Sequence, residues 1–516
     1  MVSRINTGVL SGLVANKVVA EVDMNNSIPG IVIVGLPDTA VSEAKERVRS
    51  AIKNSGYSFP SKKITINLAP ADIKKEGSLY DLPIAIGILS LEGSLNWEKT
   101  IDYAFIGELS LDGSLRAVNG VLPLVSGLKE LGIKNFIVPF ENAKEAGLIC
   151  DINIYGAKHL TDVVNHFSDN PEVHQHINKM VVDINSYMSA ENSEYDYDFK
   201  DVKGQFKAKK AMEIAAAGGH NILMSGSPGS GKTLLAKCFA SILPPLTPLE
   251  AIELTKIYSI AGLINKDNPL VTKRPFRTIH HTASAVGIIG GGSNPKPGEI
   301  TLAHRGVLFF DEVVEFPRAV LEVLRQPLED SEIVISRAHT SIKYPADFIF
   351  VGAMNPCPCG YLGDKEKNCT CSEFQIQRYR SKISGPLLDR IDIQIEVPKL
   401  KIDELINHNS IESESSKEIR ERVYNARKIQ LNRYKNSGIL TNSELTPKLI
   451  KLFCKIDDTS KNILKSIGQK FNISGRGYDR ILKLARTIAD LNNSQNIEAV
   501  HISQAVQYRN FIENNT

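Results

Sequence analysis

The stretch Gly226–Thr233, which reads GSPGSGKT, decides the fold expected for this chain. It fits the phosphate-binding pattern G-x-x-x-x-G-K-[ST]. The apolar run NILM (221–224) precedes it, and LLAKCFA (234–240) follows it. These flanks predict a strand before the loop and a helix after it, which a glycine-rich turn with an unrelated lysine would not require. We therefore expect a nucleoside triphosphate site.

The residues of this loop have separate expected roles. Its backbone N–H groups and the helix N-terminus would surround the phosphates. Lys232 would reach the β- and γ-phosphates, and the Thr233 hydroxyl would bind Mg²⁺. The expected cofactors are therefore ATP and Mg²⁺. The expected nucleotide-binding residues are Gly226, Ser227, Pro228, Gly229, Ser230, Gly231, Lys232, Thr233 and Asp311.

Two later apolar runs end in polar residues, as strands that supply a nucleotide site do. GVLFFDE (306–312) is expected to hold Mg²⁺ through Asp311 and to polarise the attacking water through Glu312. FIFVGAMN (348–355) is expected to orient that water through Asn355. An asparagine that only caps a turn before Pro356 is the alternative for the second run.

Two arginines complete the expected catalytic set. Arg390, in GPLLDRID (385–392), has little to do in its own subunit's site and is expected to enter a neighbour's site, which would require a ring. A local ion pair with Asp389 and Asp392 is the alternative. Arg476 opens a helical stretch and is expected to reach the γ-phosphate as a second sensor. Arg480 is its substitute, and a plain surface arginine is the other alternative.

Length and composition bound the rest. A chain of 516 residues suggests about three domains. A net charge of +3 provides no global field for nucleic acid, so contacts with it must be local. No apolar run approaches the ~18 residues of a membrane span, and the N-terminus lacks the features of a signal peptide. Seven cysteines without an export signal favour the reducing cytoplasm.

The front of the chain predicts a compact α/β domain. GIVIVG (30–35) is expected to be a buried strand. Asp38 or Thr39 would cap a helix with one apolar face, and Ile64, Ile66 and Leu68 would alternate along a half-exposed strand. KKEGSLYDLPIAIGILS (74–90) resembles the domain that closes Lon-type proteases. Leu79 occupies the position of the Lon serine, so no peptidase activity is expected, and Lys74 and Lys75 are expected to be solvated.

The expected architecture is α/β, with three domains and one linker. A Lon-protease-like, non-peptidase domain covers residues 1–167, and a polar linker covers 168–199. An AAA+ αβα P-loop core covers 200–400, and a C-terminal α-helical lid covers 401–516. The front domain is interpreted as a scaffold or a site for a protein partner.

Longer strings resemble one family specifically. HHTASAVGIIGGGSNPKPGEITLAHRGVLFFDE (280–312), AMNPCPCGYLGD (353–364) and SGPLLDRID (384–392) are similar to the ComM/YifB family, relatives of the magnesium chelatase ATPase subunit. The resemblance runs nearly from end to end, including the front domain that the chelatase subunit lacks. It implies a homo-hexameric ATPase that drives DNA branch migration in recombination and natural transformation.

A DNA contact is expected at the segment IVISRAHTSIK (333–343), which predicts a hairpin similar to the pore hairpin of MCM-type helicases. Arg337 and Lys343 would bind phosphates of single-stranded or branched DNA without reading bases. An ordinary solvated hairpin is the alternative. The glycine run 290–292 with Lys296 is a second candidate for a pore loop, and His280 and His281 fit packing as well as DNA contact.

Four cysteines form a C-x-C…C-x-C pattern. Cys357, Cys359, Cys369 and Cys371 could place four thiolates around a structural Zn²⁺, although the pairs are tighter than the usual C-x₂-C.

Two other functions remain open for the whole chain. One is a chelatase motor that inserts Mg²⁺ into a porphyrin, and the other is a chaperone-like ring that remodels a protein.

Overall fold

The computed structural model describes residues 2–189, 195–292, 295–337, 340–400, 413–471 and 474–509. The chain forms two compact units. The first contains Met1–Asn192 and Thr247–Thr272, and the second contains Ser193–Leu246 and Lys273–Thr516. Residues 247–272 lie inside the range expected for the ATPase core, yet they pack with the front of the chain.

The first unit is built on a seven-stranded mixed sheet in the order β3-β4-β2-β1-β5-β8-β9. The long β1 and β2 pair antiparallel, as do β2 and β4, and the other neighbours are parallel. The strands are β1 (Val2–Ser11), β2 (Val14–Asn25), β3 (Gly30–Val34), β4 (Lys63–Ala69), β5 (Tyr103–Phe105), β8 (Asn135–Pro139) and β9 (Asn153–Ala157), with β6 (Glu108–Leu109) and β7 (Leu115–Arg116) in a separate ladder.

The helices of this unit bury apolar faces on the sheet. In α1, Asp38 accepts a hydrogen bond from the backbone N–H of Val41, so Asp38, and not Thr39, is the cap among the two candidates from the sequence. The predicted alternation along β4 is also confirmed, since Ile64, Ile66 and Leu68 are buried. The helices are α1 (Thr39–Asn54), α2 (Asp81–Leu91), α3 (Val121–Glu130), α4 (Phe140–Ala146), α5 (Leu160–His166), α6 (Ile184–Ser189) and α9 (Pro248–Ala261), with the 3-10 turn η1 (Trp97–Thr100).

Two expectations for the front of the chain are wrong. Strand β3 is the last strand of the sheet, and Val32 and Val34 are exposed. A β-branched run between glycines does not distinguish an edge strand from a buried one. The Lys75 side chain is buried, and its ammonium donates a hydrogen bond to the carbonyl oxygen of Pro70. Burial lowers the pKa of Lys75. Lys74 is exposed, as expected, and pairs with Glu76.

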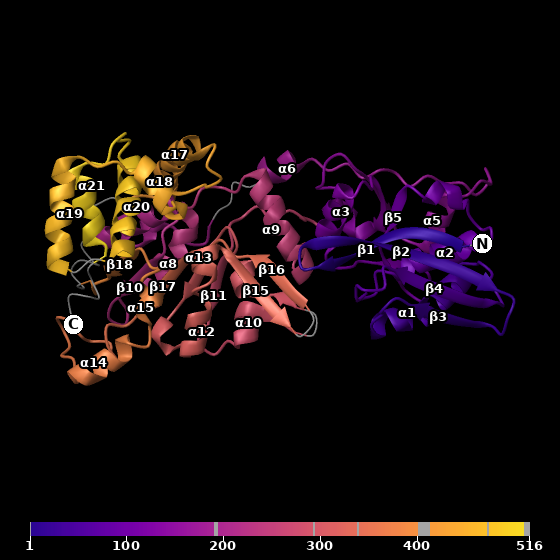
Figure 1. Cartoon of the computed structure of the whole chain (residues 1–516), viewed down its shortest axis with the longest axis horizontal. Helices are drawn as coiled ribbons and strands as arrows, with labels where there is room; N and C mark the ends of the chain where they lie inside the picture. The colour runs from indigo at the N-terminus through magenta and orange to yellow at the C-terminus, as the bar shows by residue number, and fades with distance from the viewer. Residues whose placement is uncertain are drawn as a thin grey trace. The chain divides into compact units, whose positions relative to one another are not determined.

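Helix α9 packs beside α3 in this unit (Figure 1). Thr247 and Glu250 form a capping box at its start, and Gly262 ends it with a left-handed backbone. The backbone N–H of Gly120 donates to the carbonyl oxygen of Ser259 at 3.1 Å, and the Ser259 hydroxyl donates to Glu145. A helix inserted within the ATPase sequence is therefore held by the front unit.

The second unit is built on a five-stranded sheet in the order β11-β14-β17-β10-β18, with every neighbouring pair parallel. β10 and β14 are buried at every position, as strands covered on both faces are. The strands are β10 (Ile222–Ser225), β11 (Phe276–Ile279), β14 (Val307–Phe310), β17 (Ile349–Met354) and β18 (Ile393–Glu396). Two hairpins lie outside the sheet, one formed by β12 (Gly290–Gly291) and β13 (Lys296–Pro297), the other by β15 (Glu332–Arg337) and β16 (Thr340–Pro345).

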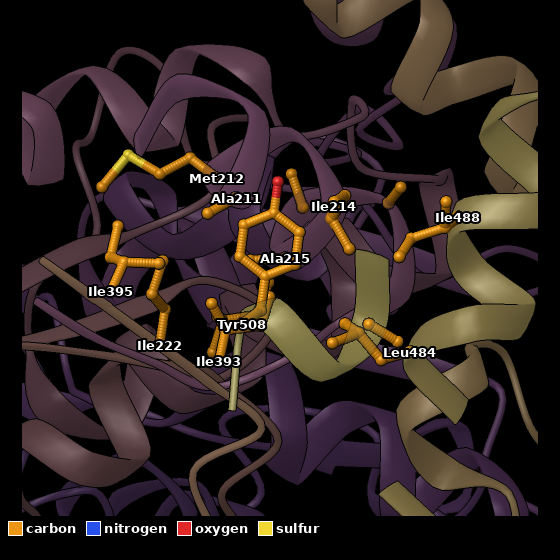
Figure 2. Close-up of a cluster of buried hydrophobic side chains, with 14 of the residues drawn as sticks. Ala211, Met212, Ile214, Ala215, Ile222, Ile393, Ile395, Leu484, Ile488 and Tyr508 are labelled. Atoms are coloured by element: carbon orange, nitrogen blue, oxygen red, sulfur yellow. The ribbon is translucent and has the colours of Figure 1, made fainter. Parts of the chain in front are cut away.

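The C-terminal helices share one apolar core with this sheet. Figure 2 shows side chains from the helix 206–218, from β10 and β18, and from the C-terminal helices meeting in it. None of the helices in the described part of the chain is long and apolar enough to cross a membrane. The helices are α7 (Phe206–Gly218), α8 (Lys232–Phe239), α10 (Ala285–Ile289), α11 (Glu299–Leu302), α12 (Arg318–Val323), α13 (Pro327–Asp330), α14 (Glu373–Arg380), α15 (Gly385–Leu388), α17 (Ser416–Tyr434), α18 (Pro447–Phe453), α19 (Asp458–Phe471), α20 (Gly475–Leu491) and α21 (Ala499–Gln507), with the 3-10 turns η2 (Phe199–Asp201), η3 (Ala240–Ile242), η4 (Val313–Glu315) and η6 (Asn442–Glu444).

Candidate nucleotide site

The phosphate-binding loop connects the buried strand β10 to helix α8, as its pattern predicted. Gly231 caps α8 with a φ of 90°, a left-handed conformation that a side chain would strain. The Lys232 ammonium lies inside the loop and donates to the carbonyl oxygens of Gly226 (2.6 Å) and Ser227 (3.0 Å). Burial lowers the pKa of Lys232, and Asp311 and Glu312 oppose that shift.

The acidic pair after β14 lies at the same edge of the sheet. The Thr233 hydroxyl donates to a carboxylate oxygen of Asp311 at 2.9 Å, which brings together the two groups expected to hold Mg²⁺. A hydroxyl and a carboxylate are oxygen donors that fit this ion. Glu312 follows with a φ of 51° and an exposed side chain. The carboxylate of Glu312 is therefore accessible beside this pair.

Asn355 extends from the end of β17 into the same site. Its side-chain oxygen lies 3.5 Å from the Lys232 ammonium. β17 pairs in register with both β10 and β14, so the carboxyl ends of all three strands meet. The loop lysine, the acidic pair and Asn355 are thus brought together. This contact favours the site over the alternative in which Asn355 only caps a turn.

Arg390 lies at the amino ends of the strands of this sheet, opposite the phosphate loop. It precedes β18, whose first residue, Ile393, pairs with the first residue of β10, whereas the phosphate loop follows the last residue of β10. A four-residue strand spans about 13 Å. Arg390 pairs with Glu329 and donates to the carbonyl oxygen of Pro386 at 2.7 Å, and its Nε is buried without a partner among the described residues.

Arg476 lies near Arg390 and not within the contacts of its own phosphate loop. The positive charge of Arg476 contributes, after burial and Arg325, to lowering the pKa of Arg390. Arg476 is exposed, and in the described part of the chain it makes no hydrogen bond or ion pair. Arg480 instead pairs with Asp392 at 3.5 Å and is largely buried, so it has a structural partner. The geometry therefore favours Arg476 over Arg480 as the available cation.

Asp392 anchors helix α20 to this end of the sheet. Its carboxylate lies 3.1 Å from the Nδ1 of His220, and the other ring nitrogen of His220 lies 2.7 Å from the Thr487 hydroxyl. Burial alone would raise the pKa of Asp392, but His220, Arg480 and Lys483 lower it to about 2. Asp389 pairs with Arg509. The ion pair of Arg390 with Asp389 and Asp392 that the sequence left open is therefore not formed among the described residues, and Arg390 pairs instead with Glu329, which is distant in sequence.

The four cysteines of the C-x-C pattern converge. The Sγ atoms of Cys357, Cys359 and Cys369 lie 3.3–3.6 Å apart, and all four sulfurs lie within 4.8 Å of one another. Four thiolates around Zn²⁺ at ~2.3 Å would have sulfurs about 3.8 Å apart. All four are free thiols, and the backbone N–H of Cys359 donates to Cys371. The donor set therefore fits a tetrahedral thiolate metal.

The predicted hairpin is formed by β15 and β16. Its buried face carries Ile333, Ile335, Ile342 and Tyr344, and its other face carries Glu332, Val334, Ser336, Ser341 and Lys343. Lys343 is exposed and lies 3.3 Å from Glu332. Residues 338–339 and the side chain of Arg337 lie outside the described residues.

Gly290 of the second hairpin packs against Ile335, and Lys296 is exposed. His280 is exposed, and the ring of His281 lies against Phe316.

Three residues that position the site were given no role from the sequence. Gln205 donates to the carbonyl oxygens of Pro398 (2.6 Å) and Ser230 (3.3 Å). The Asp364 carboxylate faces the Ser227 side chain, and the Tyr379 side chain faces the backbone of Asn355. Asp364 ends the string AMNPCPCGYLGD, but its partner is far away in sequence. No local pattern could have identified these contacts.

Comparisons with known proteins agree with this geometry. Residues 198–405 match the family model "Magnesium chelatase, subunit ChlI", residues 20–142 match "Subunit ChlI of Mg-chelatase", and residues 413–509 match the C-terminal model of that subunit. The sheet, the phosphate loop and these matches define an ATPase of the magnesium chelatase type within the AAA+ class.

Relatives that match over nearly the whole chain narrow the class. The chain is 44% identical to the competence protein ComM of Haemophilus influenzae, over 96% of this chain and 95% of ComM. It is 40% identical to the uncharacterized protein YifB of Escherichia coli, over 98% and 97% of the two chains. The magnesium-chelatase 38 kDa subunit of Cereibacter sphaeroides is 27% identical over only 31% of this chain. The chain belongs to the ComM/YifB family.

Proposed function

We propose that this ATPase works as a homo-hexameric ring that moves along DNA and drives branch migration during recombination and natural transformation. The observation that supports a ring is the separation of Arg390 from the phosphate loop. The two lie at opposite ends of the strands of one sheet. Arg390 and Arg476 would both serve the site of a neighbouring subunit. An arginine supplied in this way stabilises the charge of the phosphoryl-transfer transition state.

The residues would divide the chemistry as follows. Lys232 would bind the β- and γ-phosphates, and Thr233 with Asp311 would hold the Mg²⁺ that neutralises them. Glu312 would take the proton of the attacking water, and Asn355 would orient that water. Arg390, with Arg476, would complete the site across the subunit interface.

Mixing two inactive variants tests the shared site. Lys232→Ala subunits lack the phosphate contact, and Arg390→Ala subunits lack the arginine. In a mixed ring, an intact loop from the second variant meets an intact arginine from the first, so we expect mixing to restore part of the ATP hydrolysis. Each variant mixed with itself is the control. A mixture as inactive as its components would overturn the shared site.

The DNA assignment rests on the β15–β16 hairpin and on the name of the competence protein among the relatives. Arg337 and Lys343 would contact DNA phosphates, with Lys296 on the second hairpin as a further candidate. Six copies around a ring would multiply weak single contacts. We expect ATP hydrolysis to rise in the presence of single-stranded or branched DNA. We expect the double substitution Arg337→Ala with Lys343→Ala to remove that stimulation while basal hydrolysis remains.

A chelatase-like motor is the second candidate, because all three family models carry the name of that enzyme's subunit. The model that matches residues 20–142 carries it too, so the front of the chain does not by itself argue against a chelatase. A porphyrin-insertion assay with Mg²⁺ and ATP distinguishes the two functions.

We also propose that the front unit is Lon-like without peptidase activity and binds a protein partner. The free cysteines fit a reducing cytoplasm.

A further inference from the structure

The four-cysteine loop is continuous with the nucleotide site. Asn355, which contacts Lys232, is followed by Pro356 and then by Cys357. At the other end, Cys371 is followed by Ser372, which caps α14 through a capping box. From α14, the buried Tyr379 returns to face the backbone of Asn355. The loop 357–371 is therefore held at both ends near Asn355, the residue that contacts Lys232 of the phosphate loop.

The same loop contacts the phosphate-binding loop directly. Gly360 packs on the ring of Pro228 so closely that a Cβ at Gly360 would lie 2.8 Å from Pro228 Cδ. The buried Ser227 side chain faces the Asp364 carboxylate and, after the backbone N–H of Glu366, contributes to lowering the pKa of Asp364. Two adjacent residues of the phosphate loop are thus held from outside by the cysteine loop.

The other contacts of the loop are turns and surface pairs: Asp364 accepts from the backbone N–H groups of Glu366 and Lys367, and Glu366 pairs with Lys399. The segment 357–371 contains no helix or strand. The residue of this segment that is buried with the apolar core is Cys357. The internal backbone hydrogen bonds of the segment run from Gly360 to Cys357 and from Asp364 to Tyr361. Four thiolates on one metal ion would join its beginning to its end. The conformation that touches Ser227 and Pro228 would then depend on the metal.

We propose that a Zn²⁺ ion held by Cys357, Cys359, Cys369 and Cys371 sets the nucleotide affinity by bracing the phosphate-binding loop through Gly360 and Asp364. The inference rests on the proposed ATP site. Coupling between two binding sites is reciprocal. If Zn²⁺ raises the affinity for ATP by some factor, ATP must therefore raise the affinity for Zn²⁺ by the same factor. We expect a factor of about ten, within the usual range for such coupling.

The first experiment compares the protein with its zinc and after removal of zinc by a chelator. Elemental analysis gives the metal content, and a fluorescent ATP analogue gives the nucleotide affinity. We expect about one zinc per chain, an ATP affinity that falls about tenfold on its removal, and recovery when zinc is added back. ATP should slow the transfer of zinc to the chelator. Absence of zinc from the purified protein, or equal affinity with and without it, overturns the inference.

Two glycines of the loop provide a matched pair of variants. Gly360→Ala keeps all four cysteines but places its Cβ against Pro228, whereas Gly363→Ala carries similar backbone strain with its nearest neighbour, a Glu396 oxygen, 3.8 Å away. We expect both to retain zinc and only Gly360→Ala to lose ATP affinity. Equal affinities in the two variants would overturn the brace. Failure of the zinc-loaded natural protein to bind ATP would instead refute the proposed nucleotide site.

Discussion

The polar cluster beside the sheet of the first unit differs from the one at the carboxyl ends of the strands in the second. In the first unit, Arg47 forms two hydrogen bonds with the buried Asp81, at 2.8 and 2.9 Å, and the Ser78 hydroxyl donates to Glu108. In the second unit, the polar residues at the carboxyl edge of the parallel sheet point into one site, and Glu312 is exposed.

This difference separates polar groups that hold a fold from those available to a ligand. A buried carboxylate with an internal cation is a structural element whose loss destabilises the protein. Phosphates and Mg²⁺ need donors and carboxylates that remain accessible. The comparison therefore assigns chemistry to the second unit and stability to the polar cluster of the first. Substitutions in the two places should have opposite consequences.

The largest expected effect is on hydrolysis in the second unit. Glu312→Gln keeps the shape of the side chain and removes the base, so ATP hydrolysis should fall about a thousandfold, within the range for general bases. ATP affinity and thermal stability should stay close to those of the natural protein. Steady-state hydrolysis and binding of a fluorescent ATP analogue measure the two separately. Unchanged hydrolysis would remove Glu312 from the mechanism.

Lys232→Ala should instead abolish binding. The ammonium would make two charge-assisted contacts with phosphate oxygens, each contributing about 2 kcal/mol. Together they amount to a loss of about a thousandfold in ATP affinity. Lys237→Ala, one turn later on α8, is the matched control and should bind ATP normally. A similar loss in both variants would indicate damage to the helix and not to a phosphate contact.

The first unit should respond in stability alone. Arg47→Ala leaves Asp81 buried without its partner, and breaking such a pair costs about 3–5 kcal/mol. Trp97 is the only tryptophan and lies in the first unit, so its fluorescence reports unfolding there. Arg116→Ala removes an exposed pair with Glu108 and should cost less than about 1 kcal/mol. If Arg47→Ala lost ATP binding together with the unfolding that Trp97 reports, the two units would not respond separately.

The smallest expected effect is a pH dependence of opposite sign in the two units. Burial raises the pKa of Asp81 to about 6, although Arg47 opposes the shift. The folded first unit therefore holds this proton where the unfolded chain has lost it. The contribution to stability is present below about pH 4 and is lost, by about 3 kcal/mol, as pH rises through 6. Trp97 unfolding curves of the natural protein and Asp81→Asn should diverge across that window.

Asp392 should behave in the reverse sense. Its pKa of about 2 lies below that of an unfolded aspartate. Its stabilising contribution, about 2.5 kcal/mol, is present above about pH 4 and is lost as pH falls towards 2. The loss of ATP-analogue binding after acid exposure, compared between the natural protein and Asp392→Asn, measures this in the second unit. Divergence above pH 6 instead would contradict the assignment.

The sequence predicted the parts of the molecule that depend on neighbours along the chain. The phosphate loop, its flanking strand and helix, and the apolar face of α1 follow from local patterns. Long-range packing decided the rest. Nothing near Lys75 indicates that its side chain is buried, and nothing near β3 indicates that it ends a sheet. Glu329 became the partner of Arg390 because the fold brings together segments 61 residues apart.

The placement of α9 has a practical consequence for dissecting this protein. The polypeptide passes between the two units three times, at the boundaries after Asn192, Leu246 and Thr272. Deleting residues 1–192 would leave α9 in the product with Ala251, Leu254 and Ile257 stripped of their covering. An ATPase fragment would have to omit 247–272 as well and rejoin the chain across the gap. Exchanging the front unit for that of a relative would likewise require replacing both 1–192 and 247–272.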